Sequence, residues 1–190
     1  MAPGRCVAPR EPAVPGSMYT RVSKALAALA YPGRLHAGQR RQADPASIVH
    51  PLEVCSLLYH AGAPDHVIAA GVLHGAIEKT DVTASDLRMR FGLTIVTLVL
   101  GLTEDERITC YERRKAALRE QVASAGRDAL MVFRRRQMSK ARELGLGSEQ
   151  TRKSRPESAL DRAERDRKLA HYRRCLEFLE HRLTDSRLVT

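Results

Sequence analysis

The sequence has few aromatic residues. It contains no tryptophan, three phenylalanines and five tyrosines, which together make up 4% of its 190 residues. Proteins that stack nucleic-acid bases need aromatic side chains close to basic ones. The most basic run, residues 134–136, has only Phe133 beside it, and three consecutive helical residues point in three directions. We therefore do not expect a nucleic-acid partner.

Paired cysteines and long apolar runs are also missing. The cysteines are scattered and form no Cys-x-x-Cys motif, so we expect all four to be reduced and structural. The first residues lack the apolar core of a signal peptide, and no apolar run is long enough to cross a membrane. These features predict a cytoplasmic protein without membrane contact.

Acidic residues are outnumbered by basic ones. There are 22 aspartates and glutamates against 32 lysines and arginines, which gives a formal net charge of +10. A strongly basic chain favours anionic partners, so we expect a small anionic molecule, such as a nucleotide, as the ligand. The alternative is an arginine-rich surface without a specific partner.

The chain divides into a short tail and one folded unit. Residues 1–17 are rich in proline and show no periodicity, which predicts a disordered tail. A hydrophobic content of 43% is enough for a folded body, so we expect one domain over residues 18–190. The polar, glycine-containing segment 145–156 is expected to be a loop or linker within it.

Helical patterns dominate the folded unit, and we predict an all-α bundle of about eight helices. The first helix should begin near residue 18 and kink or break at Pro32-Gly33. Thr83 and Asp86 resemble a capping box, and Gly92 should end the helix that follows. Further helices are expected over 51–62, 65–79, 93–102, 112–122, 128–144 and 157–184. The apolar segment 93–102 could also be a strand by propensity, and as a helix it offers a surface for a homodimer.

Two stretches hold the candidate functional residues. Pro51 suits the first position of a helix, which would place His50 at the helix mouth. The run 70–80 is apolar nearly all round, as expected for a buried helix. His74 and Glu78 lie four residues apart and would share one face of that helix.

These stretches resemble a known family. Residues 48–54 (IVHPLEV) and 73–80 (LHGAIEKT) are similar to the I-V-H-P-L-E-V and L-H-D-x-x-E-D-T motifs of HD-type phosphohydrolases, specifically the RelA/SpoT-like alarmone pyrophosphohydrolases. Residues 134–142 correspond to a third motif, A-A-D-K-L-x-N-x-R. The resemblance covers about residues 20–190. It implies an HD-type helical bundle and removal of pyrophosphate from the 3′ position of ppGpp.

The chain departs from these motifs where the family has acids. In the family, two histidines and two aspartates hold one divalent ion, usually manganese, and a Glu-Asp pair acts on the attacking water. By resemblance, His50 and His74 match the histidine ligands. Gly75 and Arg136 stand in place of the two ligand aspartates. Hard cations need anionic oxygen ligands, so we expect no metal and no other cofactor, with manganese only if hydrolysis survives.

The Glu-Asp pair and the last motif are altered as well. Glu78 is kept, but Lys79 replaces its aspartate neighbour and Lys140 replaces the motif's asparagine. A positive charge ~4 Å from a bound cation would cost about 4 kcal/mol at an effective dielectric constant near 20. Ordinary alarmone hydrolysis is therefore not expected.

Several functions remain open. The one we favour is metal-independent acid–base catalysis on a small anionic molecule by Glu78, His74 and His50, which would suit a specialised biosynthetic route. A second is non-catalytic binding of a nucleotide or phosphate by basic side chains. Those side chains are Arg40, Arg41, Lys79, Arg136 and Lys140. An inert scaffold is a third function class and a residual manganese-dependent hydrolase a fourth, so whether the chain is an enzyme stays open.

Overall fold

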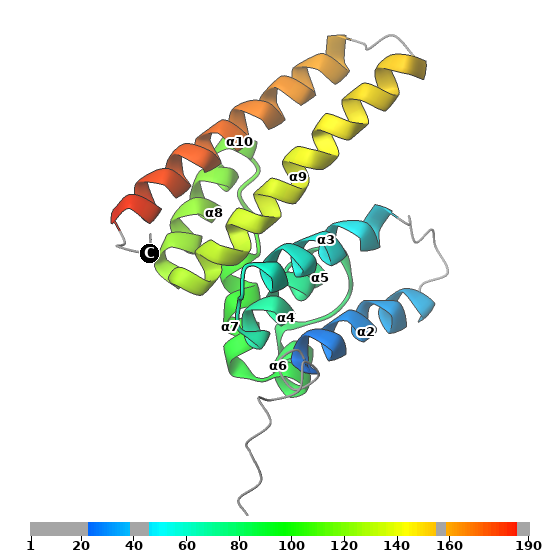
Figure 1. The fold of residues 1–190 in the computed structure, drawn as a ribbon, viewed down its shortest axis with the longest axis vertical. Helices are drawn as coiled ribbons and strands as arrows, with labels where there is room; N and C mark the ends of the chain where they lie inside the picture. Colours follow the sequence, from blue (N-terminus) through cyan, green and yellow to red (C-terminus); the bar gives the residue numbers. More distant parts are fainter. Residues whose placement is uncertain (1–22, 39–45, 155–158, 186–190) are drawn as a thin grey trace, which may run out of the picture.

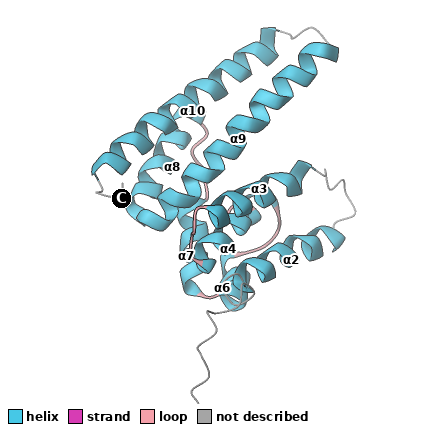
Figure 2. Ribbon diagram, in the orientation of Figure 1, coloured by secondary structure: helices cyan, strands magenta, loops and turns pink. Residues whose placement is uncertain are grey.

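Every regular element that the structure describes is a helix (Figures 1 and 2). The computed structural model describes residues 23–38, 46–154 and 159–185, and the expected tail lies outside these ranges. Within them the chain forms nine helical segments, one of which is a single turn. These are α2 (Ser23–Gly38), α3 (Ala46–His60), α4 (Asp65–Leu73), α5 (Ala76–Lys79), α6 (Ala84–Phe91), α7 (Leu93–Leu102), α8 (Tyr111–Ala125), α9 (Arg127–Ser154) and α10 (Ala159–Asp185). The predicted all-α architecture is confirmed.

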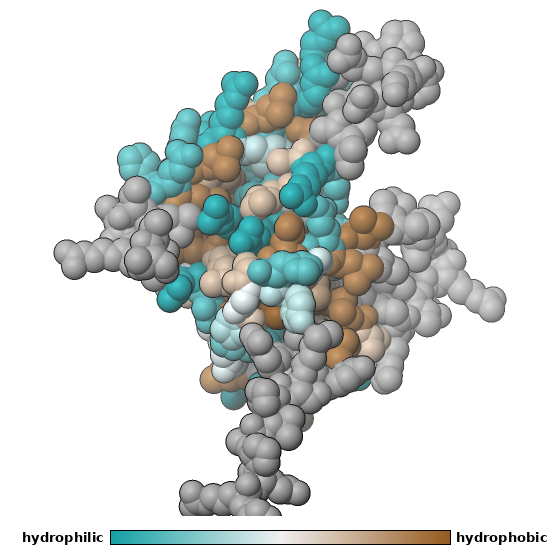
Figure 3. Space-filling model, in the orientation of Figure 1, coloured by the Kyte–Doolittle hydropathy of each residue, from teal (hydrophilic) through white to brown (hydrophobic). Residues whose placement is uncertain are grey.

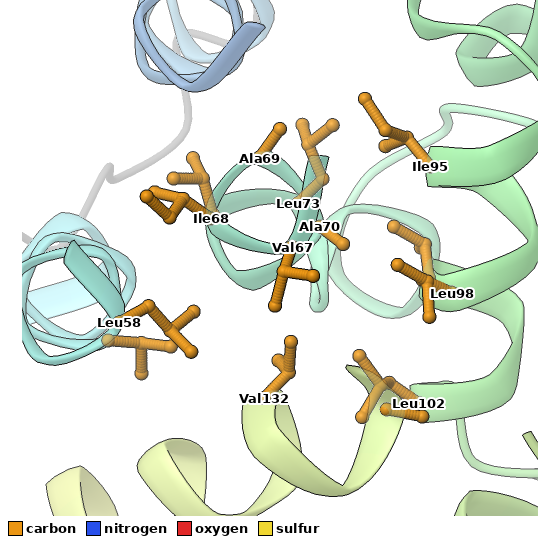
Figure 4. Packing of buried hydrophobic residues seen from close by; sticks show 14 of the residues in the cluster. Leu58, Val67, Ile68, Ala69, Ala70, Leu73, Ile95, Leu98, Leu102 and Val132 are labelled. Carbon is orange, nitrogen blue, oxygen red and sulfur yellow. The ribbon is translucent and has the colours of Figure 1, made fainter. Parts of the chain in front are cut away.

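Helix α4 is the centre of the core. Its sequence is apolar on every side, and all residues from 67 to 73 are buried. Figure 4 shows its side chains packed against Leu58 of α3, Ile95 and Leu102 of α7, and Val132 of α9. Helices α3 and α4 approach closely at Gly71, where a Cβ would run into the Leu58 side chain. This packing fixes the position of the residue that follows α4, His74.

The start of α4 also holds the start of α2. The Asp65 carboxylate accepts hydrogen bonds from the backbone N–H groups of Lys24 and Ala25, each at 3.0 Å. Backbone donors in the first turn of a helix have no partner within the helix. Asp65 therefore satisfies two of these donors on α2 and fastens α2 to the core.

Helix α3 begins earlier than the sequence indicated. It starts at Ala46, so Pro51 lies inside the helix and His50 does not stand at a helix mouth. Proline removes one hydrogen bond to the carbonyl four residues back, here that of Ser47. The cost falls near the helix start, and burial of Val54 and Leu58 on the same helix offsets it.

The single helix expected over 65–79 is interrupted. Helix α4 ends at Leu73, His74 is its C-cap, and α5 begins only at Ala76. Gly75 has φ −107° and ψ 5°, away from the helical region. Glycine is a poor helix former because its backbone loses the most conformational freedom. His74 and Glu78 therefore belong to different segments and do not share a face of one helix.

The signals around α6 and α7 are confirmed. The Thr83 hydroxyl accepts from Asp86 N while the Asp86 carboxylate accepts from Thr83 N, as in a capping box. Gly92 has φ 88°, a left-handed conformation that favours glycine, and it separates α6 from α7. Segment 93–102 is helical and most of its large side chains are buried.

No break occurs at two other positions where the sequence indicated that a helix could end. Helix α2 continues through Pro32-Gly33, and α9 continues to Ser154, through most of the segment expected as a loop. In α9, Gly145 and Gly147 each cost roughly 1 kcal/mol of helix stability, and the good helix formers around them offset that cost. Helices α9 and α10 form a long antiparallel pair that projects beyond α2–α7 (Figure 1). No described helix is both long and apolar enough to cross a membrane.

Candidate functional site

A pair of buried histidines forms the centre of the site. His50 comes from α3 and His74 from the end of α4, and their side chains are 2% and 3% exposed. Their Nε2 atoms lie 3.2 Å apart, and the rings meet edge to face. The structure therefore places His50 and His74 next to each other, as the family resemblance implied.

Hydrogen bonds on the far side of each ring fix the tautomers. Ser139 Oγ donates to a Glu53 carboxylate oxygen at 2.7 Å, so at 2.8 Å it accepts from His50 Nδ1. A carboxylate oxygen of Glu143, 3.3 Å from the same Nδ1, is also an acceptor. His74 Nδ1 lies 2.6 Å from the Gly71 carbonyl, which can only accept. Both Nδ1 atoms therefore carry the hydrogen.

The two Nε2 atoms consequently face each other as acceptors. In neutral rings neither has a hydrogen to donate, so the 3.2 Å contact joins two lone pairs. Burial lowers the pKa of His50 to about 3, with further lowering from Lys140, Arg136 and Lys79. Burial, and next the charge of Arg136, place the pKa of His74 well below its usual value. At neutral pH the two Nε2 atoms can accept a proton or another electrophile, but they carry no proton to donate.

Glu78 is held away from the histidines by other partners. Its carboxylate accepts from Glu104 N at 2.8 Å and lies 3.7 Å from a terminal nitrogen of Arg136. Arg136 also donates to the Leu102 carbonyl at 2.9 Å. No hydrogen bond among the described residues joins Glu78 to either imidazole.

Arg136 lies within a small network of partly buried charges. A second carboxylate, that of Glu104, lies 3.8 Å from Arg136 and bonds to Arg114 and Lys115. Burial by itself would raise the pKa of Glu104, but the hydrogen bond and charge of Lys115, with Arg136, hold it below its usual value. Arg136 thus joins α9 to α5, to the end of α7 and to the segment that follows α7.

Lysines flank the pair on another side. The Lys79 side chain lies over Gly75, since a Cβ built there would be 3.5 Å from Lys79 Cε. Partial burial of the ammonium group, and then repulsion from Lys140 and Arg136, lower the pKa of Lys79. No carboxylate among the described residues forms an ion pair with Lys79, whereas Lys140 contacts Glu143 at 2.7 Å.

Of the predicted binding residues, the structure brings three to one region. Lys79, Arg136 and Lys140 all act electrostatically on His50. Arg40 and Arg41 lie outside the described residues, so their role stays a prediction.

Sequence reasoning missed the residues that orient His50. Glu53 lies in the first motif, one helical turn after His50, and is bound by Ser139 and Arg142 at 2.7 and 2.9 Å. Ser139 is 89 positions from His50, and the third motif pointed to Arg136 and Lys140 as its functional residues. The one available signal was the position of Glu53 on the same helix face as His50.

The groups around the pair that could bind a metal are the two imidazoles and three carboxylates. Two imidazole nitrogens converge, but the nearby carboxylates of Glu53, Glu78 and Glu143 are engaged by cations or hydroxyls. Within the described part of the chain, no group of three or more histidine, cysteine, aspartate or glutamate side chains is arranged to hold a metal ion.

Comparison with known proteins identifies the family and the fold of the chain. The family model described as "HD domain" matches residues 28–177, most of the chain. The chain therefore belongs to the HD-domain family. A solved structure titled as a metazoan ortholog of SpoT that hydrolyses ppGpp has the same fold, with a TM-score of 0.65, 22% identity, and coverage of 83% of this chain and 85% of that one.

The chain is also similar, over about half of its length, to curated enzymes of two names. A human guanosine-3′,5′-bis(diphosphate) 3′-pyrophosphohydrolase is 34% identical over 103 residues, which is 52% of this chain and 57% of that protein. A GTP pyrophosphokinase of Streptomyces coelicolor is 33% identical over 96 residues, 50% of this chain and 11% of its own length. Each aligned region is less than two thirds of the relative.

Proposed function

We propose that this chain is an HD-domain protein that has lost divalent-metal hydrolysis and binds a small phosphorylated anion of the nucleotide class. Its relatives named as pyrophosphohydrolases act on a guanosine bis(diphosphate). The observation that carries the proposal is the cluster of Lys79, Arg136 and Lys140 around two neutral histidines, with Gly75 offering no side chain at all.

The loss of metal binding is supported by the donor set. A divalent ion between the imidazoles would find nitrogen ligands but no free anionic oxygen, and it would be repelled by Arg136 and Lys79. Lys79 also covers the space beside Gly75. The residues present therefore do not fit the family's ion, and no step of the proposed function uses one.

Binding of an anion is supported by the mutual repulsion of the cations. Lys140 and Arg136 lower the pKa of Lys79 by more than Glu78 and Glu143 raise it, so positive charge predominates in a partly buried place. A phosphate among them would remove this repulsion, and it would gain charge-assisted hydrogen bonds. Lys79, on the exposed side of the cluster, is the group best placed to meet a ligand from solvent.

The proposal predicts metal-independent binding of phosphorylated ligands. Calorimetric titration with ppGpp, GDP and pyrophosphate in the presence of EDTA should give saturable binding, which Lys79→Ala weakens roughly tenfold to a hundredfold, as expected for loss of one charged hydrogen bond. Lys168→Ala, a lysine on α10 that pairs with Glu164, is the matched control and should bind like wild type.

Two results would contradict this function. Absence of binding by every phosphorylated ligand would remove the anion site. Manganese-dependent release of pyrophosphate from ppGpp would show that the chain still works as its relatives are named, and the loss of the metal would be wrong.

Metal-independent acid–base catalysis remains the second candidate. The facing Nε2 acceptors favour it, because a substrate proton delivered between His50 and His74 would gain two acceptors at once. Since both rings are neutral at physiological pH, any acid must be another group. Their low pKa values also make them weak bases, and for this reason we rank binding first.

Catalysis and binding can be separated at Glu78. If the site catalyses, phosphorus and proton NMR should detect conversion of a bound nucleotide without metal, and Glu78→Gln should abolish turnover while the ligand affinity changes little. Equal turnover by wild type and Glu78→Gln would show that Glu78 is neither acid nor base.

A further inference from the structure

A groove with an apolar floor runs along the seam between α9 and α10, away from the histidine pair. Two adjoining cavities of about 440 and 350 Å³ lie there, and both are lined by Ala141, Tyr172 and Leu176. Because the cavities share these residues, they form one continuous groove, which we call the hairpin groove. Figure 3 shows apolar side chains along this antiparallel pair.

The floor of the hairpin groove includes large apolar side chains left open to solvent. Leu169 and Leu176 are 39% and 55% exposed, although the same helix buries Cys175 and Leu179. They are seven residues apart, two helical turns, so they lie along one line of α10. A continuous exposed apolar strip between polar rims is typical of a binding surface.

The shape of the groove fits a helix. Its lining on α10 extends from Arg165 to Glu180, which is about 22 Å at 1.5 Å per residue. That length accommodates a helical segment of about 15 residues. Helices that bind such grooves insert apolar side chains at positions i, i+3 or i+4, and i+7.

The rim of the groove determines the charge of its partner. Arg134, Arg165 and Arg173 line it, against one acidic residue, Glu180. A second copy of this chain, packed groove to groove by a two-fold axis, would bring two rims of net positive charge together. The whole chain carries a net charge of +10, which adds to that repulsion. An acidic partner has neither disadvantage.

We propose that the hairpin groove binds an acidic amphipathic helix of another protein. The apolar side chains of that helix would cover Leu169 and Leu176, and its carboxylates would meet the arginines of the rim. This interaction does not depend on the ligand of the histidine site, and its test does not involve nucleotides.

The test uses the full chain and a synthetic probe. A fluorescent peptide of about 15 residues, with leucines at helical spacing and glutamates elsewhere, is titrated in an anisotropy assay. Saturable binding is expected, with an affinity that decreases as salt increases. Leu176→Glu should weaken it at least about tenfold, since an apolar contact is lost and a like charge is added.

Controls separate this site from general stickiness. Leu100 on α7 is 45% exposed, close to the exposure of Leu176, so Leu100→Glu should leave peptide binding unchanged. A peptide with lysines in place of glutamates, and one with the same composition in scrambled order, should bind at least about tenfold more weakly.

Four outcomes would overturn the proposal. The first is equal binding of the acidic and lysine peptides, and the second is an equal loss of peptide affinity in the Leu176→Glu and Leu100→Glu variants. The third is a stable dimer in sedimentation that Leu176→Glu dissociates. The fourth is stronger binding to phosphatidylglycerol vesicles than to the peptide. The third would assign the groove to a second copy of the chain, and the fourth to a lipid surface.

Discussion

Replacement of Arg136 by alanine is expected to lower the free energy of unfolding by about 3 kcal/mol. Arg136 is 13% exposed and pairs with Glu78, which is 15% exposed, whereas Glu104 also pairs with Arg114 and Lys115. Removal of one member of a buried ion pair leaves the other charge without compensation, a cost of roughly 3–5 kcal/mol in other proteins. The hydrogen bond to the Leu102 carbonyl is lost as well.

Urea denaturation at neutral pH measures this effect, and a second arginine on α9 provides the control. Arg142 pairs with Glu53 at 2.9 Å, a closer contact than either ion pair of Arg136, but its side chain is 55% exposed. Exposed pairs contribute about 1 kcal/mol or less, so Arg142→Ala should cost correspondingly little. Equal losses from the two variants would mean that Arg136 has no special structural role.

Arg136→Lys should fall between these variants. It keeps one positive charge near Glu78 and Glu104, but the lysine lacks the planar fork that reaches the carboxylates and the Leu102 carbonyl together. If the lysine variant is as unstable as the alanine variant, the stability that Arg136 provides comes from its hydrogen bond and packing and not from its charge.

Acidification from about pH 7 to about pH 5 is expected to destabilise the protein by roughly 4 kcal/mol. Three buried histidines carry this effect: His50, His74 and His171. Burial, followed by Lys115 and Arg119, lowers the pKa of His171 to about 4, and burial together with nearby cations lowers the pKa values of His50 and His74. The ordinary value in an unfolded chain is about 6.5.

The sign follows from proton uptake. Between the folded and unfolded pKa values the unfolded chain binds more protons, so stability is fully present above about pH 6.5 and decreases as the pH falls. At about pH 5 His171 alone accounts for roughly 2 kcal/mol. The His50–His74 pair accounts for at least as much, although one proton shared between the Nε2 atoms makes its cost smaller than that of two separate rings.

The slope of stability against pH is the measurement, because it remains informative in a weakened variant. His171→Phe removes one buried titrating ring and should flatten the slope, and His60→Gln, which replaces an exposed ring, is the matched control. Glutamates with lowered pKa values, such as Glu104, act at lower pH and do not enter this window. Constant stability between about pH 7 and pH 5 would contradict the histidine assignment.

The sequence was sufficient for features that depend on local chemistry. The Thr83 capping box and the Gly92 break follow from residue types and spacings within a few positions. Segment 93–102 could have been a strand by propensity, and its helical nature was expected from the helical segments around it and from the family resemblance. The proximity of His50 and His74 came from resemblance to known motifs, because nothing local joins two residues on different helices. The HD-domain family is confirmed, while the catalytic and binding roles of the predicted residues stay predictions.

Features that depend on distant partners could not be predicted. The hydrogen bond from His50 to Ser139 spans 89 positions, and only the packing of α3 against α9 brings the two residues together. The interruption at Gly75 was missed because the apolar pattern continues across this residue, although the helix does not. The predicted loop at 145–156 failed for the opposite reason, since two glycines were insufficient to stop α9.

Helix α9 supplies Arg136, Ser139 and Lys140 to the histidine side and Arg134, Met138 and Ala141 to the hairpin groove. An α-helix rotates by about 100° with each residue, so one inserted or deleted position within this stretch would turn the side chains that follow it away from the faces they occupy. Natural variants of the chain should therefore tolerate many substitutions on α9 but no insertion or deletion within residues 134–141.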